Sequence, residues 1–224
     1  DVDSMGNMFI RRAGKNRALP PVMTGSHVDS QPQGGNYDGI YGVLAGLEVL
    51  RTLNDNQTET ERDIVLVNWT NEEGARFAPA MLASGVWSGQ LTQEFAYARS
   101  DSAKITVREA LEAIGYRGEL PARAFPVHAC YELHIEQGPI LEDEGIDIGL
   151  VRAAMGQRWF TITLEGFAAH AGTTPMHSRR DALTAFAELA LQVEAIGYQH
   201  APDGRSTIGM AQVTPNSRNV VPSR

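Results

Sequence analysis

Apolar residues occur in blocks that predict alternating strands and helices in the first two thirds of the chain. Residues 19–26 and 64–67 are apolar runs typical of strands, and the unbroken aliphatic run 64–67 favours a strand buried on both faces of a parallel sheet. Between them, apolar positions recur at helical spacing and predict a helix over residues 40–54. Residues 8–10 predict a short edge strand, and residues 129–135 predict another strand.

Two further helices begin with capping signals. Thr106 and Glu109 have the spacing of a capping box and predict a short helix that Gly115 ends. Residues 178–181 precede a long stretch of helical periodicity and predict a helix that reaches about residue 196.

The pattern changes near residue 154, where apolar and polar positions begin to alternate. Residues 160–165 predict a half-buried strand, and residues 208–213 and 219–221 predict two more. We therefore expect two domains, residues 1–153 and residues 154–224. The expected fold class is α/β, with a mixed, mostly parallel sheet flanked by helices in the first domain and an α+β second domain.

Charge and composition exclude several functions. The net charge is −8 and no basic stripe occurs, which argues against binding to nucleic acid or to an anionic membrane. No apolar run reaches the roughly 18 residues that span a bilayer. The single cysteine, Cys130, favours a reducing compartment, and we expect a cytoplasmic protein. The chain starts without Met, so we expect it to be a fragment of a longer protein.

A glycine-rich stretch over residues 25–42 joins the first predicted strand to the first predicted helix, where ligands bind in open α/β sheets. His27 could bind a divalent metal through one ring nitrogen while Asp29, two residues on, accepts the other ring N–H. Asp38 could bridge two cations from its glycine-rich turn. The alternatives are a capping Asp29 beside a surface His27, and an Asp38 that only supplies hydrogen bonds to the turn.

Two more predicted strands end in groups that bind metals. Glu72 and Glu73 follow residues 64–67, and adjacent side chains that leave a strand point in different directions. Glu73 is therefore assigned to a metal and Glu72 to the general base that takes a proton from water. His134 lies near the end of the predicted strand over residues 129–135 and could complete the metal site. Solvated acids and a structural histidine are the alternatives.

The second domain offers two candidates in loops. His170 could donate a hydrogen bond to a developing oxyanion, and Asn219 could bind a carboxylate or an amide. From these residues alone, ordinary loop hydrogen bonding is the favoured interpretation of both.

Together these motifs resemble the amidase and carbamoylase branch of the dinuclear-metal M20 peptidase family. The branch contains N-carbamoyl-L-amino-acid hydrolases, β-ureidopropionases and allantoate amidohydrolases. The matching motifs occur in order along essentially the whole chain: His27-Val-Asp29, Asn36-Tyr-Asp38-Gly39, Asn71-Glu72-Glu73-Gly74, His134-Ile-Glu-Gln137-Gly138, His170-Ala-Gly-Thr-Thr-Pro175 and Asn219-Val-Val-Pro222.

The resemblance implies a role for each matched residue. His27 and His134 would hold one metal ion and Glu73 the other, with Asp38 bridging the two. Glu72 would be the general base, and Asp29 would orient His27. The positions that contact substrate in the family are Gln137, Arg158, His170 and Asn219.

The resemblance also implies an inserted lid domain over residues 154–224 that dimerises, with His170 acting on the partner subunit of a homodimer. The first domain would be a partial metal-binding catalytic domain. The family's last metal-binding histidine and a substrate-binding arginine follow the lid, so both would lie beyond Arg224.

The expected activity is hydrolysis of N-carbamoyl-L-amino acids to the amino acid, CO2 and ammonia. Residues 29–32, 40–48 and 157–159 resemble carbamoylases more than allantoate enzymes. An allantoate amidohydrolase, a di-metal aminopeptidase or dipeptidase, and an inactive dimerising module remain alternatives. The expected cofactors are two divalent metal ions, zinc first, with Mn, Ni or Co as alternatives for the same ligands.

Overall fold

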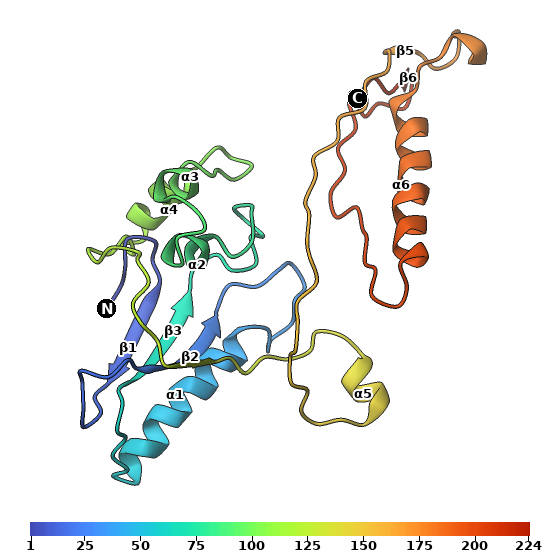
Figure 1. Cartoon of the computed structure of the whole chain (residues 1–224). Coiled ribbons are helices and arrows are strands. Elements are labelled where there is room, and N and C mark those ends of the chain that lie inside the picture. Colours follow the sequence, from blue (N-terminus) through green and yellow to red (C-terminus); the bar gives the residue numbers. More distant parts are fainter. The chain divides into compact units, whose positions relative to one another are not determined.

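The computed structural model describes residues 1–224, and the chain divides into two compact units, Asp1–Leu150 and Val151–Arg224. The first unit contains a four-stranded sheet in the order β1-β3-β2-β4, flanked by α1 (Figure 1). The strands are β1 (Met8–Arg12), β2 (Val22–His27), β3 (Ile64–Trp69) and β4 (Ala129–Tyr131).

Strand directions agree with the predicted mixed, mostly parallel sheet. β2 is parallel to β3 and to β4, whereas β1 is antiparallel to β3 and forms an edge, as residues 8–10 predicted. The α/β fold class is therefore confirmed. β4 ends at Tyr131 rather than at residue 135, so His134 lies on the segment after the strand.

Helix α1 (Ile40–Asp55) packs against β2 and β3 through a face that contains two glycines and one leucine (Figure 1). Its buried positions Gly42, Gly46 and Leu50 recur every four residues and therefore share one face. A Cβ atom at Gly42 would lie 2.3 Å from the carbonyl oxygen of Leu133, so only glycine permits this approach. The close contact fixes α1 beside the carboxyl ends of the strands.

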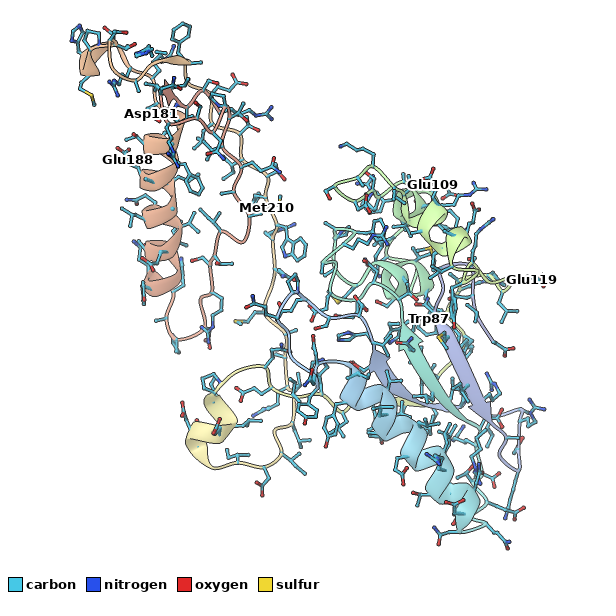
Figure 2. The ribbon with its side chains drawn as sticks, turned by 180° about the vertical axis from the view of Figure 1, so that it is seen from behind. Trp87, Glu109, Glu119, Asp181, Glu188 and Met210 are labelled. Atoms are coloured by element: carbon cyan, nitrogen blue, oxygen red, sulfur yellow. The ribbon has the colours of Figure 1, made fainter.

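Three short helices form a second layer of the first unit: α2 (Leu82–Trp87), α3 (Gln93–Tyr97) and α4 (Val107–Ala113). They enclose a cluster around fully buried Leu82 and Met5. α4 begins with the predicted capping box, since Thr106 and Glu109 each bond to the other's backbone N–H, and Glu109 is labelled in Figure 2.

An aromatic cluster covers the sheet beside this layer. Trp87 packs edge-on against Trp69 and Phe125, with ring centroids 5.2 and 5.5 Å apart, and it is labelled in Figure 2. These rings surround buried Met23, Val65 and Val67 of β2 and β3. The unbroken apolar run over residues 64–67 is thus buried as the sequence predicted. A last short helix, α5 (Ile140–Glu144), buries no residue.

The second unit contains α6 (Ala182–Gln199), a short 3-10 helix η1 (Met176–Ser178) and a two-stranded antiparallel sheet. The sheet pairs β5 (Ala169–His170) with β6 (Val220–Val221). Asp181 caps α6 by accepting the N–H groups of Leu183 and Thr184, and Figure 2 labels it at the start of the helix.

Two strands predicted for the second unit do not form. Residues 160–165 and 208–213 make no backbone–backbone hydrogen bonds, and Phe160 and Met210 are both 80% exposed. An alternating pattern specifies a strand only where a neighbouring strand supplies hydrogen bonds, and neither segment has such a neighbour in this chain. No helix of either unit has the length and apolar character needed to cross a bilayer.

Candidate metal centre

The parallel register of β2 and β3 places two candidate segments side by side at the carboxyl ends of these strands. His27 pairs with Trp69, the last residues of their strands, so the turn that carries Glu72 and Glu73 begins beside His27. Asp38 lies two residues before the first residue of α1. His27 and Asp38 are 2% and 3% exposed, and the two glutamates are half-buried.

Two overlapping groups of potential ligands share His27. His27, Asp38 and His134 offer ligand atoms that all lie within 4.8 Å of one another, and His27, Glu72 and Glu73 form a second such group. The Nε2 atom of His134 lies 3.3 Å from His27 Nε2 and 3.5 Å from Asp38 Oδ1. The structure therefore brings together the four predicted metal ligands, His27, Asp38, Glu73 and His134.

The orientation of the two histidine rings suits a cation. His27 Nδ1 lies 2.7 Å from the carbonyl oxygen of Asp29, and His134 Nδ1 lies 2.7 Å from that of Ile135. Since a carbonyl only accepts, each Nδ1 donates and each Nε2 presents a lone pair. Two nitrogens bound to one tetrahedral zinc at about 2.0–2.1 Å would be about 3.3–3.4 Å apart. The donor set therefore fits a divalent cation.

The carboxylates show the effect of their proximity. Burial, a hydrogen bond to Asp38 and the charges of Asp38 and Glu72 raise the pKa of Glu73 to about 7. Burial acts against the charged form of Asp38, but hydrogen bonds from Glu73, Ser30 and Gly39 outweigh it and lower the pKa of Asp38. The raised pKa of Glu73 and the lowered pKa of Asp38 are typical of two carboxyl groups that lie close enough to hold one cation between them.

Glu72 is half-buried and lies beside the potential metal ligands. Burial and the nearby charges of Asp29 and Glu132 raise the pKa of Glu72, and the two histidines oppose this shift. Its Oε2 atom lies 3.5 Å from His27 Nε2. The side chain therefore faces the same space as the potential ligands.

The structure gives Asp29 a different contact from the one predicted. His27 Nδ1 meets the backbone oxygen of Asp29, while the nearest carboxylate oxygen lies 3.8 Å away. The carboxylate instead accepts the backbone N–H groups of Glu72 and Glu73, both at 3.1 Å. Asp29 thus orients His27 through its main chain and fixes the Glu72–Glu73 turn through its side chain.

Several residues around this centre were not singled out from the sequence. Gly39 lies so close to His27 that a Cβ atom there would be 2.3 Å from the imidazole ring. Ser30 donates a hydrogen bond to Asp38 Oδ2 at 3.0 Å, and Ser26 donates to Glu132 at 2.5 Å. The glycine directly after a candidate ligand and a serine in the same glycine-rich loop were the available signals, since only the contact between Ser26 and Glu132 joins distant parts of the chain.

The residues predicted to contact substrate lie in both units. Gln137, in the first unit, donates from Nε2 to the carbonyl oxygen of Gly34 at 3.0 Å, so its amide links the glycine-rich loop to the segment that follows His134. In the second unit, Arg158 is exposed and makes no hydrogen bond or ion pair. His170 and Asn219 are neighbours across the β5–β6 pair, where Ala171 donates its N–H to the Asn219 carbonyl at 2.9 Å.

Comparison with known proteins points to one family. The family model described as peptidase family M20/M25/M40 matches residues 23–213. An N-carbamoyl-L-amino-acid amidohydrolase of Rhizobium meliloti is 48% identical over 223 residues, which cover 100% of this chain and 54% of that protein. An allantoate amidohydrolase of Bacillus subtilis is 34% identical over 224 residues, covering 99% of this chain and 54% of that protein.

A solved structure agrees in fold as well as in sequence. The amidase of the hydantoinase/carbamoylase family from Burkholderia vietnamiensis matches with a TM-score of 0.96 and 56% identity, covering 99% of this chain and 54% of that one. The chain thus spans about half the length of the curated relatives that it matches.

Proposed function

Since the chain belongs to peptidase family M20/M25/M40, we propose that the protein containing it hydrolyses the ureido C–N bond of N-carbamoyl-L-amino acids. The products are the amino acid, CO2 and ammonia. The observation that carries this proposal is the pair of ligand groups that share His27, with Glu72 beside them. The similarity to an N-carbamoyl-L-amino-acid amidohydrolase supports the choice of substrate.

We assign His27, Asp38 and His134 to one divalent cation and Glu73, with Asp38 as the shared ligand, to a second. Zinc suits this set of imidazole and carboxylate groups, and Mn, Ni or Co are alternatives. Bound there, divalent cations supply polarisation of the ureido carbonyl and a lower pKa for the attacking water.

Glu72 is the proposed general base. Its raised pKa and its position 3.5 Å from His27 Nε2 suit a group that takes a proton from the attacking water and gives it to the leaving nitrogen. Asp29 holds the backbone of Glu72 in place during both transfers. The second unit is the proposed lid and dimerisation domain, from which His170 donates a hydrogen bond to the developing oxyanion in a cytoplasmic homodimer.

A substrate panel tests the proposal. The full-length protein, loaded in turn with Zn, Mn, Ni or Co, would be assayed with N-carbamoyl-L-methionine, N-carbamoyl-β-alanine and allantoate. We expect the highest kcat/KM with N-carbamoyl-L-methionine. Preference for allantoate would instead establish the alternative that the Bacillus subtilis relative favours, an allantoate amidohydrolase. Absence of both turnover and bound metal would refute the proposed hydrolase.

A further inference from the structure

The turn that follows β5 holds the His170 ring in one tautomer. The backbone N–H groups of Gly172 and Thr173 both donate to His170 Nδ1, at 3.0 and 3.3 Å. The N–H of Thr174 also donates to the His170 carbonyl oxygen at 3.2 Å. A ring nitrogen that accepts hydrogen bonds carries no proton, so neutral His170 has its proton on Nε2.

The Nε2–H group is the part of His170 that remains available to a ligand. In this tautomer Nε2 can only donate a hydrogen bond, as the proposed contact with a developing oxyanion requires. Rotation of the ring, or loosening of the turn, would remove the two N–H groups from Nδ1 and permit the other tautomer. The geometry of the turn therefore decides whether His170 acts as a donor or as an acceptor.

One side chain joins the two ends of this turn. Arg179 Nη2 donates to the carbonyl oxygen of Ala171 at 2.6 Å, and Arg179 Nε donates to that of Thr174 at 3.1 Å. The planar guanidinium suits such a two-point contact, which lysine cannot reproduce. Arg179 is half-buried and forms no ion pair with a carboxylate, so backbone carbonyls are its protein partners.

The neighbouring residue Arg180 provides a matched comparison. It has the same side chain one position later in the sequence, is exposed, and makes no side-chain hydrogen bond or ion pair. Comparing substitutions of the two arginines separates the loss of the Arg179 hydrogen bonds to the turn from the loss of a positive charge.

We propose that Arg179 is a positioning residue that clamps the Ala171–Thr174 turn and so keeps His170 in the tautomer that donates from Nε2. Arg179 touches neither substrate nor metal ligands in this assignment. The part of the inference that concerns rate rests on the proposed function, because it assigns His170 to the oxyanion. The part that concerns the tautomer rests only on the contacts within the second unit.

Steady-state kinetics of the full-length enzyme test whether Arg179 affects the rate of hydrolysis. The variants are Arg179→Gln, Arg179→Lys and Arg180→Gln. An oxyanion donor acts in the transition state, and loss of one costs about 10²–10³ in kcat. We expect Arg179→Gln to lower kcat about tenfold or more with KM changed less than about threefold. Arg179→Lys should fall between it and the wild type, and Arg180→Gln should match the wild type. Equal effects of Arg179→Gln and Arg180→Gln would overturn the assignment.

Nitrogen-15 NMR of histidine-labelled protein tests the tautomer without any turnover. We expect the His170 signal, identified by its loss in His170→Ala, to report an unprotonated Nδ1 in the wild type and in Arg180→Gln, and a mixture in Arg179→Gln. An unchanged tautomer in folded Arg179→Gln would contradict the inference. If the wild type hydrolyses no ureido substrate, the proposed function fails while this measurement still decides the role of Arg179.

Discussion

The carboxylate of Asp29 accepts the backbone N–H of Glu73 at 3.1 Å. Its other oxygen accepts the N–H of Glu72 at the same distance. One side chain two residues after β2 therefore fixes the main chain of both glutamates, although 43 and 44 positions separate them from it. The relative placement of the proposed base and the proposed metal ligand depends on this contact.

Replacement of Asp29 by asparagine should weaken metal binding. An amide keeps one acceptor oxygen but points an NH2 group at the second backbone N–H, so one of the two bonds is lost. We expect Asp29→Asn to lower metal affinity about 10–100-fold, as loss of a residue that orients ligands does. Isothermal titration of the apo protein measures this, with the exposed Asp147→Asn as control. Equal affinities in the two variants would show that the contact does not hold the site.

Removing the charge of Glu72 should impair turnover, whereas removing the charge of Glu73 should impair metal binding. Glu72→Gln should keep the wild-type metal content but lose about 10²-fold or more in kcat, because a neutral amide cannot accept the proton from water. Glu73→Gln should lose metal, because it removes a ligand. Elemental analysis and initial rates on the same preparations separate the two effects. Turnover by Glu72→Gln at the wild-type rate would end its assignment as the base.

Gly39 tests how tightly the site is packed. A methyl group there would lie 2.3 Å from the His27 ring, which would have to move. The backbone of Gly39 has a φ of −46°, which alanine also adopts, so the expected defect is local to the ring. We expect Gly39→Ala to lower metal affinity at least about tenfold. Gly156→Ala, where a Cβ meets no atom within 4 Å, serves as control, and unchanged affinity in Gly39→Ala would argue against His27 as a ligand.

Metal binding should stabilise the folded protein, and this stabilisation should depend on His134 but not on His128. A ligand present at 100 times its Kd stabilises the folded state by about 2.7 kcal/mol. We expect added Zn²⁺ to raise the melting temperature of apo wild type and of His128→Ala, and to have much less effect on His134→Ala. His128 lies before β4, with its N–H bonded to the Pro21 carbonyl, far along the strand from the metal-binding edge. A full Zn²⁺ effect in His134→Ala would remove it from the ligand set.

The contacts of Asp63, which lies outside the metal centre, predict that the stability of the protein depends on pH. Its buried carboxylate accepts the N–H of Gly14 and pairs with Arg11, both at 2.8 Å, and these contacts lower the pKa of Asp63. Because the unfolded pKa is about 3.9, the stabilisation is present above that pH and is lost as the pH falls through the lower folded value.

We therefore expect Asp63→Asn to lower the free energy of unfolding by about 1–3 kcal/mol at pH 7. The difference from wild type should shrink below about pH 4. Urea unfolding at pH 7 and pH 3 measures it, with exposed Asp55→Asn as control. A difference of the same size at both pH values would show that the charge of Asp63 is not responsible.

Local contacts explain what the sequence alone determined. The capping box of Thr106 and Glu109 and the Asp181 cap join residues two or three positions apart, so their spacing in the sequence already specifies them. The buried run over residues 64–67 needs only its own composition to predict a strand. The four candidate ligands stood out because each lies at or just after the end of a predicted strand or in a glycine-rich turn, and the resemblance to the M20 family implied the same set.

Tertiary structure decided which atoms of those residues meet. His27 and His134 are 107 positions apart, and only the β4-β2-β3 register brings their Nε2 atoms to 3.3 Å. The Asp29 carboxylate bonds to the glutamate turn rather than to His27 because that turn leaves the neighbouring strand beside it. Residues 160–165 alternate between apolar and polar side chains but form no strand. A strand needs backbone hydrogen bonds to a second strand, and the sequence of one segment does not show whether that partner is present.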